Sequence, residues 1–117
     1  MSRGPLPGST VRGSVSGRPI MAALDLLGRR WALRVLWELR EGPLPFRALQ
    51  SACGDISASV LRDRLAELRE AGIVEHCRGV GYALAPMGRS LTQALAPLLS
   101  WSEAWAESLD RPGAPSP

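Results

Sequence analysis

The chain has 117 residues, a formal net charge of +3 and two cysteines. A chain of this length has room for one domain with its own buried core, and two cysteines are too few for a disulfide framework. The N-terminus does not resemble a secretory segment, and no apolar run approaches the roughly 20 residues needed to cross a bilayer. The sequence therefore predicts a soluble cytoplasmic protein without a membrane partner.

Arginine supplies all 14 basic residues, and the isoelectric point of 9.6 invites a nucleic-acid interpretation. Arg3, Arg12 and Arg18 account for the excess of positive charge, because arginines and acidic residues are equal in number after them. Bulk charge therefore does not establish DNA binding, and the placement of individual charges has to decide.

The two ends of the chain are predicted to lie outside the folded domain. Residues 1–18 are rich in glycine, proline and serine without apolar periodicity, which predicts a disordered basic arm. The arm either has no function or follows a DNA minor groove, as homeodomain arms do. Residues 111–117 predict a disordered tail, so the domain is expected to span residues 19–110.

Two helices are predicted first along the domain. One begins at Pro19, which suits a first helical turn, and ends at Gly28. Residues 31–42 predict the second, in which Leu33 and Trp37 lie apart from the main apolar stripe and predict a second buried contact. The main stripe consists of Ala32, Val35, Leu36 and Leu39.

A proline-rich extended connector at residues 42–46 leads into a short predicted helix at residues 46–53, with Phe46 and Leu49 turned inward. The best-marked helix then runs over residues 57–71. Its boundary and core residues are the N-cap Ser57, the stripe of Leu61, Leu65 and Leu68, the staple between Ile56 and Leu61, and the closing Gly72.

The opposite face of this helix carries Ser59, Arg62, Asp63 and Ala66. Small residues at 57–59 allow a close approach to phosphates and base edges, and Arg62 is placed one turn further to reach either of them. Arg64 is nearer the core stripe, which gives it a phosphate or a structural role. The alternative is an ordinary solvated helix whose arginines pair with neighbouring acids.

The remaining elements are a hairpin and a long helix. Residues 73–78 and 81–86 predict two strands joined by a tight turn at Gly79-Val80-Gly81. A last helix is predicted over residues 88–109, provided that Pro97 only kinks it. Its apolar stripe, which is too apolar to face solvent, holds Leu91, Ala94, Leu95, Leu98, Trp101, Trp105 and Leu109.

Two short helices, a hairpin and a terminal helix in this order predict a mainly α fold with a small β-hairpin, the winged helix-turn-helix. The chain also resembles the HxlR family of bacterial winged-helix transcriptional regulators. The motifs that carry the resemblance are Leu27-Gly28 before Arg30-Trp31, Phe46-x-x-Leu49, Ile56-Ser57-x-x-x-Leu61-x-x-Arg64-Leu65-x-x-Leu68, Ala71-Gly72-Ile73-Val74 and Tyr82-x-Leu84-x-Pro86-x-Gly88-x-x-Leu91.

The resemblance implies a homodimer on double-stranded DNA, with an inverted-repeat operator and a cytoplasmic, nucleoid-associated location. It assigns dimer contacts to the first and last helices, namely Ile20, Leu24, Leu91, Leu95, Leu98, Trp101 and Trp105. It assigns DNA contacts to the helix start, the wing and the turn before the second helix, namely Ser57, Ala58, Ser59, Arg62, Arg64, Arg78, Arg29 and Arg30. The last two lack local acids, which suits phosphate contact, although solvated arginines are the alternative.

Two features differ from the family pattern. The wing loop at residues 78–81 is short, which limits the reach of Arg78 into a minor groove. Arg18 stands where some relatives have a redox-sensing cysteine, so that mechanism is not transferred. Cys53, activated by Arg47 or a helix end, or Cys77 could replace it, but both are alternatively buried and inert.

Repression of transcription is the expected function, and a winged-helix module for protein association is its rival. A thiol-responsive or ligand-responsive regulator is a further alternative, since the four tryptophans line either an effector pocket or a core or dimer seam. An enzyme is not expected because no nucleophile and base stand at a readable spacing. One histidine and two cysteines match no tetrahedral pattern, so neither a metal nor a cofactor is expected.

Overall fold

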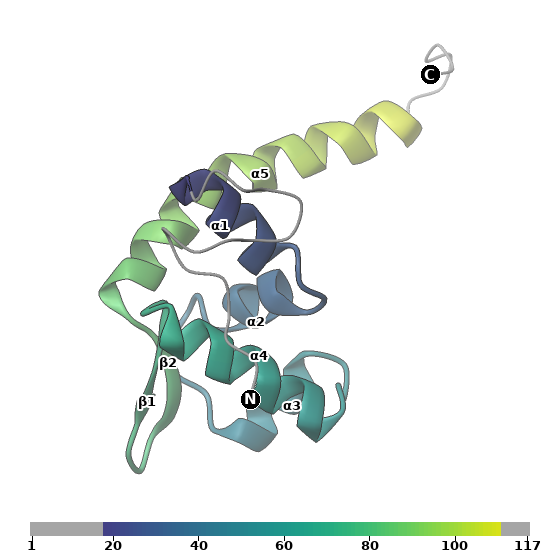
Figure 1. Ribbon diagram of the computed structural model, residues 1–117. Coiled ribbons are helices and arrows are strands. Elements are labelled where there is room, and N and C mark those ends of the chain that lie inside the picture. The colour runs from purple at the N-terminus through teal and green to yellow at the C-terminus, as the bar shows by residue number, and fades with distance from the viewer. Residues whose placement is uncertain (1–17, 111–117) are drawn as a thin grey trace.

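The computed structural model describes residues 18–110, which form five helices and one antiparallel hairpin (Figure 1). This confirms the predicted fold class. The predicted arm and tail lie outside the described residues, apart from Arg18. No helix within residues 18–110 is both long and apolar enough to span a bilayer. The elements are α1 Pro19–Leu27, α2 Ala32–Glu38, α3 Phe46–Ala52, α4 Ala58–Glu70, β1 Val74–Cys77, β2 Gly81–Leu84 and α5 Pro86–Asp110.

The core lies where α2, α3 and α4 meet the base of the hairpin. The predicted stripes of α2 and α4 are confirmed, since Val35, Leu36, Leu61, Leu65 and Leu68 are all buried. Leu49 of α3 joins them, whereas Phe46 is half-buried and packs at the edge of the core.

Helix α2 differs from its prediction in two ways. It ends at Glu38, four residues earlier than expected, because a turn over residues 39–42 follows it. Leu33 and Trp37 were expected to make a second buried contact, yet they are 41% and 42% exposed. The guanidinium of Arg40 lies 3.6 Å from the centre of a Trp37 ring and supplies its cover instead. An apolar pair on a helix therefore indicates that cover is favourable, but it does not show whether a buried contact or a neighbouring polar side chain supplies that cover.

The hairpin forms the wing, and the connector before α3 extends it. Cys77 pairs with Gly81, which leaves a loop of three residues, 78–80. Leu44 and Tyr82 exchange both of their backbone hydrogen bonds, at 2.9 and 2.8 Å, so the proline-rich connector runs antiparallel beside β2. Gly81 has a φ of +132°, and a Cβ there would collide with the carbonyl of Leu44. Glycine is therefore required at this position for the wing to dock.

Helix α5 begins two residues earlier than predicted and continues through Pro97, as expected. It packs against α2 and β2, and a Cβ on the buried Gly88 would collide with the carbonyl of Ile73. The C-terminal half of α5 extends away from the other elements in Figure 1. The predicted apolar stripe exists, but residues 18–110 leave most of it uncovered, since Leu98, Trp101, Trp105 and Leu109 are 50–59% exposed.

Candidate nucleic-acid interface

The start of α4 is fixed by local sequence. Ser57 has extended backbone angles, and its hydroxyl accepts a hydrogen bond from the Val60 amide at 3.2 Å. Ile56 and Leu61 are both buried on either side of this cap. The N-cap prediction is therefore confirmed. The small side chains that follow, Ala58 and Ser59, leave the first helical turn open to a close approach by another molecule.

The outer face of α4 is exposed as predicted at Ser59, Arg62, Asp63 and Ala66. Arg62 forms no ion pair with any residue in 18–110, and its guanidinium lies 5.6 Å from the centre of the Phe46 ring. An exposed guanidinium supported by an aromatic edge keeps its five donors available. Arg62 is therefore placed to contact a ligand outside the chain.

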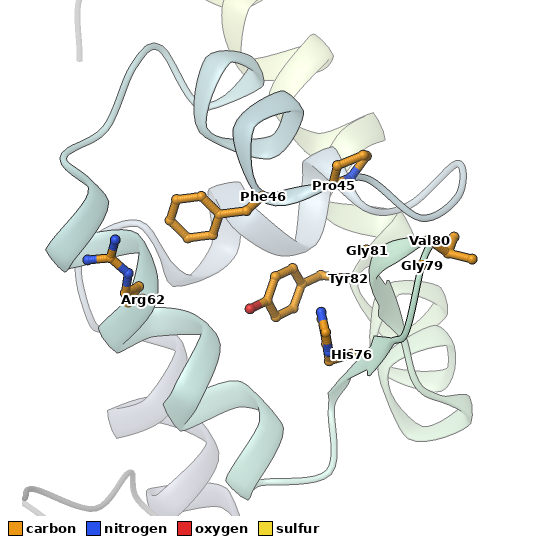
Figure 2. A pocket seen from close by; sticks show the side chains of 8 residues that line it. All are labelled: Pro45, Phe46, Arg62, His76, Gly79, Val80, Gly81 and Tyr82. Carbon is orange, nitrogen blue, oxygen red and sulfur yellow. The ribbon is translucent and has the colours of Figure 1, made fainter.

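A groove of about 510 Å³ separates α4 from the wing. Figure 2 shows Arg62 projecting from α4 on one side, with the Tyr82 ring between those of Phe46 and His76. The Tyr82 centroid lies 6.4 Å from that of Phe46 and 4.7 Å from that of His76. The lining consists of Pro45, Phe46, Arg62, His76, Gly79, Val80, Gly81 and Tyr82. Arg62 on the outer face of α4 and the residues of the wing therefore line the same groove.

Sequence reasoning missed three aromatic residues of this groove: Phe46, His76 and Tyr82. The hairpin register could have revealed two of them, because a loop of three residues pairs His76 with Tyr82. Arg78 is exposed in the wing loop and is not part of the groove lining.

Two of the other predicted arginines, Arg29 and Arg64, lie together around the buried Glu67. Arg29 donates to Glu67 Oε2 at 2.9 Å and lies 3.7 Å from Asp25, while Arg64 Nε is 3.2 Å from Glu67 Oε1. The expectation that Arg29 has no acid nearby is therefore wrong. Arg30 is exposed and forms no ion pair with a described residue, and its guanidinium lies 5.5 Å from a Trp31 ring centre.

The two thiols differ in environment. Cys53 is fully buried, and this burial raises the pKa of its thiol. Glu38 raises that pKa further, while Arg34 opposes the shift. Of the two alternatives for Cys53, its burial supports an inert thiol and not activation by Arg47 or a helix end, because the thiolate is disfavoured. Cys77 is half-buried in β1.

The tryptophans do not line either cavity. Trp31 is half-buried against the core, and neither the groove beside the wing nor the cavity near Glu67 has a tryptophan in its wall. Trp101 and Trp105 stack on one another on α5, with centroids 5.6 Å apart and planes 12° from parallel. Of the two alternatives for the tryptophans, an effector pocket is not supported by the lining of these two cavities.

Several known transcriptional regulators are similar to this chain in sequence and fold. The transcriptional regulator YvaP of Bacillus subtilis is 29% identical over 91 residues, which cover 73% of this chain and 84% of YvaP. The crystal structure of quinone-bound YodB from B. subtilis is 30% identical, with a TM-score of 0.67 over 73% of this chain and 94% of that one. A possible HxlR family transcriptional factor from Thermoplasma volcanium is 28% identical, with a TM-score of 0.67 over 76% and 85% of the two chains. Residues 26–110 match the HxlR-like helix-turn-helix family, and the chain therefore belongs to this family of transcriptional regulators.

Proposed function

We propose that this protein represses transcription by binding an inverted-repeat operator as a homodimer. The observation that carries the proposal is the outer face of α4, which has a capped start of small residues and, one turn further, Arg62, which forms no ion pair within residues 18–110 and lines the same groove as the wing. A major groove about 12 Å wide admits one α-helix, and a guanidinium can donate two hydrogen bonds to a guanine edge. Such a protein works in the cytoplasm, at the nucleoid.

Each predicted contact residue has a distinct role in this proposal. Ser57, Ala58 and Ser59 let the helix start approach the DNA backbone, and Arg62 reads a base edge. Arg30 and Arg78 are exposed and free to reach phosphates, which position the protein without reading sequence. Arg29 and Arg64 form ion pairs with Glu67, and their positive charge favours the approach of DNA to α4.

Homodimerisation is supported by the uncovered apolar face of α1 and α5. Ile20 and Leu24 on α1 are 56% and 57% exposed, and the stacked Trp101 and Trp105 on α5 are 58% and 54% exposed. Each tryptophan can cover about 150–250 Å² in an interface. A two-fold dimer built on this face also explains an inverted-repeat site, with half-sites roughly 34 Å apart. The exposed Leu98 and the half-buried Leu95 extend the proposed contact, whereas Leu91, which was also expected there, packs against the core of its own chain.

A small-molecule effector is a second candidate property, favoured by the quinone-bound structure of YodB. Of the two thiols, Cys77 is within reach of a reactive small molecule, whereas Cys53 is fully buried. Loss of operator affinity on treatment with a quinone, and retention of affinity in Cys77→Ser, would support a thiol response at this residue.

The test starts from fragments of the source genome selected by the purified protein. Fluorescence anisotropy on the selected site is expected to show a steep fall of affinity with salt. Arg62→Ala should weaken binding by about 1–3 kcal/mol and relax the preference at one base pair. Arg69→Ala is the matched control, because Arg69 is exposed on the last turn of the same helix.

Two outcomes would contradict the proposal. Selection that yields no preferred sequence would favour a winged-helix module for protein association. Equal losses in Arg62→Ala and Arg69→Ala would show that charge alone, and not the outer face at the start of α4, carries the binding.

A further inference from the structure

A second cavity, of about 380 Å³, lies between α1 and α4, and two of its arginines contact the buried Glu67. Its walls come from the end of α1, from the turn that follows it and from the middle of α4. The lining residues are Leu24, Asp25, Gly28, Arg29, Arg30 and Arg64. Three guanidinium groups therefore meet at one cavity that the proposed operator contact does not use for reading bases.

The charges around this basic cavity do not balance. Arg29, Arg30 and Arg64 face two carboxylates, those of Asp25 and Glu67, which leaves one positive charge in excess. A single oxygen of Glu67 serves both Arg29, at 2.9 Å, and Arg64, at 3.4 Å. Arg30 has no ion-pair partner among residues 18–110. A further anion would be attracted to this place because like charges held close together are costly when unpaired.

The arginine donors also exceed the acceptors. The Nε atoms of Arg29 and Arg64 are buried and make no hydrogen bond with a described residue. Arg64 Nε is 3.2 Å from Glu67 Oε1, which is close enough for an ion pair but poorly aligned for a hydrogen bond. Glu67 therefore does not satisfy either guanidinium fully, and the accessible parts of the two side chains, 26% for Arg29 and 17% for Arg64, are what an additional charged acceptor can reach.

We propose that the basic cavity binds one phosphate-type oxyanion between Arg29, Arg30 and Arg64. A tetrahedral oxyanion offers acceptors in several directions, so it can engage guanidinium groups that approach from different elements. A planar carboxylate matches one guanidinium fork and leaves the others unserved. The phosphate group belongs either to a free phosphorylated compound or to a DNA backbone.

The inference rests on the proposed function only where DNA supplies the phosphate, through Arg30, because the cavity and its donors exist without DNA. Its position gives the oxyanion two neighbours with proposed roles. Leu24 stands both in the cavity wall and on the exposed face of α1, and Arg64 belongs to α4. An oxyanion bound in the cavity would therefore contact both α1, which carries part of the proposed dimer face, and α4, which carries the proposed DNA contact.

The arginine Nε–H signals in a ¹⁵N–¹H NMR spectrum provide a direct test. Inorganic phosphate is titrated into the full chain at constant ionic strength, with chloride as the balancing anion. The signals of Arg29 and Arg64 are expected to shift along a saturating curve, while that of Arg69 stays in place. Shifts that are linear in phosphate, or equal for all three arginines, would overturn the proposal.

Substitutions make the test specific. Arg64→Lys keeps the charge but removes the fork, and is expected to weaken phosphate binding about tenfold or more. Arg69→Lys is the matched control and should bind as the unchanged chain does. Glu67→Gln removes the competing carboxylate and is expected to bind phosphate more tightly, whereas weaker binding in this variant would contradict the site. Backbone amide signals in the same spectra verify that each variant is folded.

A final titration identifies the source of the phosphate. Selected genomic DNA is added in place of inorganic phosphate, and the Nε signals of Arg29 and Arg64 are followed again. If DNA shifts them and then prevents phosphate from binding, the oxyanion is a backbone phosphate. If phosphate still binds to the DNA complex, it is a free compound. Failure of DNA binding leaves the phosphate titration unaffected, so the two proposals fail separately.

Discussion

Helices α4 and α5 carry the same kind of sequence signal but have different surroundings. Leu61, Leu65 and Leu68 form an apolar stripe on α4 and are at most 2% exposed. Trp101 and Trp105 continue a comparable stripe along α5 and are more than half exposed. The periodic pattern therefore indicates that a face needs cover, while the cover itself depends on which elements the topology brings to that face.

The topology explains the difference. Helix α4 follows α3 through a short turn and leads directly into β1, so α2 and the hairpin base lie against its inner face. Helix α5 leaves the end of β2, packs on α2 and β2, and then extends beyond the other elements (Figure 1). The stripe on its C-terminal half has no part of residues 18–110 opposite it, which supports a second copy as the cover.

The largest expected effect comes from breaking the covered stripe. Leu65→Ala should lower the free energy of unfolding by about 2–5 kcal/mol, because the packed core around it cannot collapse fully into the cavity. Urea denaturation followed by circular dichroism measures this loss. Leu109→Ala is the control, since Leu109 is 59% exposed on α5, and it should change the free energy of unfolding little at concentrations below the dissociation constant of the proposed dimer. Equal losses in the two variants would contradict the distinction between the stripes.

The next largest effect concerns the uncovered stripe. Trp105→Ala should weaken self-association by about 2 kcal/mol, or roughly thirtyfold, as expected for an aromatic residue at the centre of an interface. Sedimentation equilibrium over a range of concentrations measures the dissociation constant. Trp37→Ala is a matched control, because Trp37 is also exposed but lies on α2 under Arg40. If the unsubstituted protein is monomeric at all concentrations, the proposed homodimer is wrong.

The same comparison explains how far the sequence predicts the molecule. The cap at Ser57 and the α4 stripe depend on residues within one or two turns, so local patterns are sufficient. The contact between Arg29 and Glu67 joins positions 38 residues apart, and no local pattern predicts it. The prediction of a buried contact for Leu33 and Trp37 fails for the same reason, since helix periodicity does not identify the element that covers a face.

The candidate site was predictable to a similar extent. Arg62 was placed outward by its angle on the helix, and this was confirmed. The groove partners Tyr82 and His76 required the hairpin register, while Phe46 required knowledge of how α3 packs against the wing. Arg64 could be placed near the core stripe, but its ion pair with Glu67 follows from side-chain conformations and not from helix spacing alone.

A smaller effect is expected at the start of α4. Ser57→Ala removes the hydroxyl that accepts from the Val60 amide, and should lower the free energy of unfolding by about 1 kcal/mol. Ser59→Ala is the control for stability, because Ser59 is exposed and lies outside the cap. Thermal unfolding of both variants measures the difference, and no loss in Ser57→Ala would show that the staple alone fixes the helix start.

The smallest effect is a change in pH dependence at the buried Cys53. Burial raises the pKa of this thiol above its ordinary value of 9.0, whereas the unfolded chain ionises near that value. Well below pH 9 both states keep the proton, so Cys53 has little influence on the pH dependence there.

Above pH 9 the unfolded state loses its proton first, and the free energy of unfolding falls as pH rises. One proton limits the slope to about 1.4 kcal/mol per pH unit, hence at most about 0.7 kcal/mol between pH 9.0 and 9.5. Urea denaturation at these two pH values measures the fall in the unchanged chain, in Cys53→Ala and in Cys77→Ala. The decrease in the free energy of unfolding should be smaller in Cys53→Ala and unchanged in Cys77→Ala, because Cys53 is the fully buried thiol. An unchanged fall in Cys53→Ala would mean that another group titrates on unfolding and that solvent reaches the core beside α2 and α3.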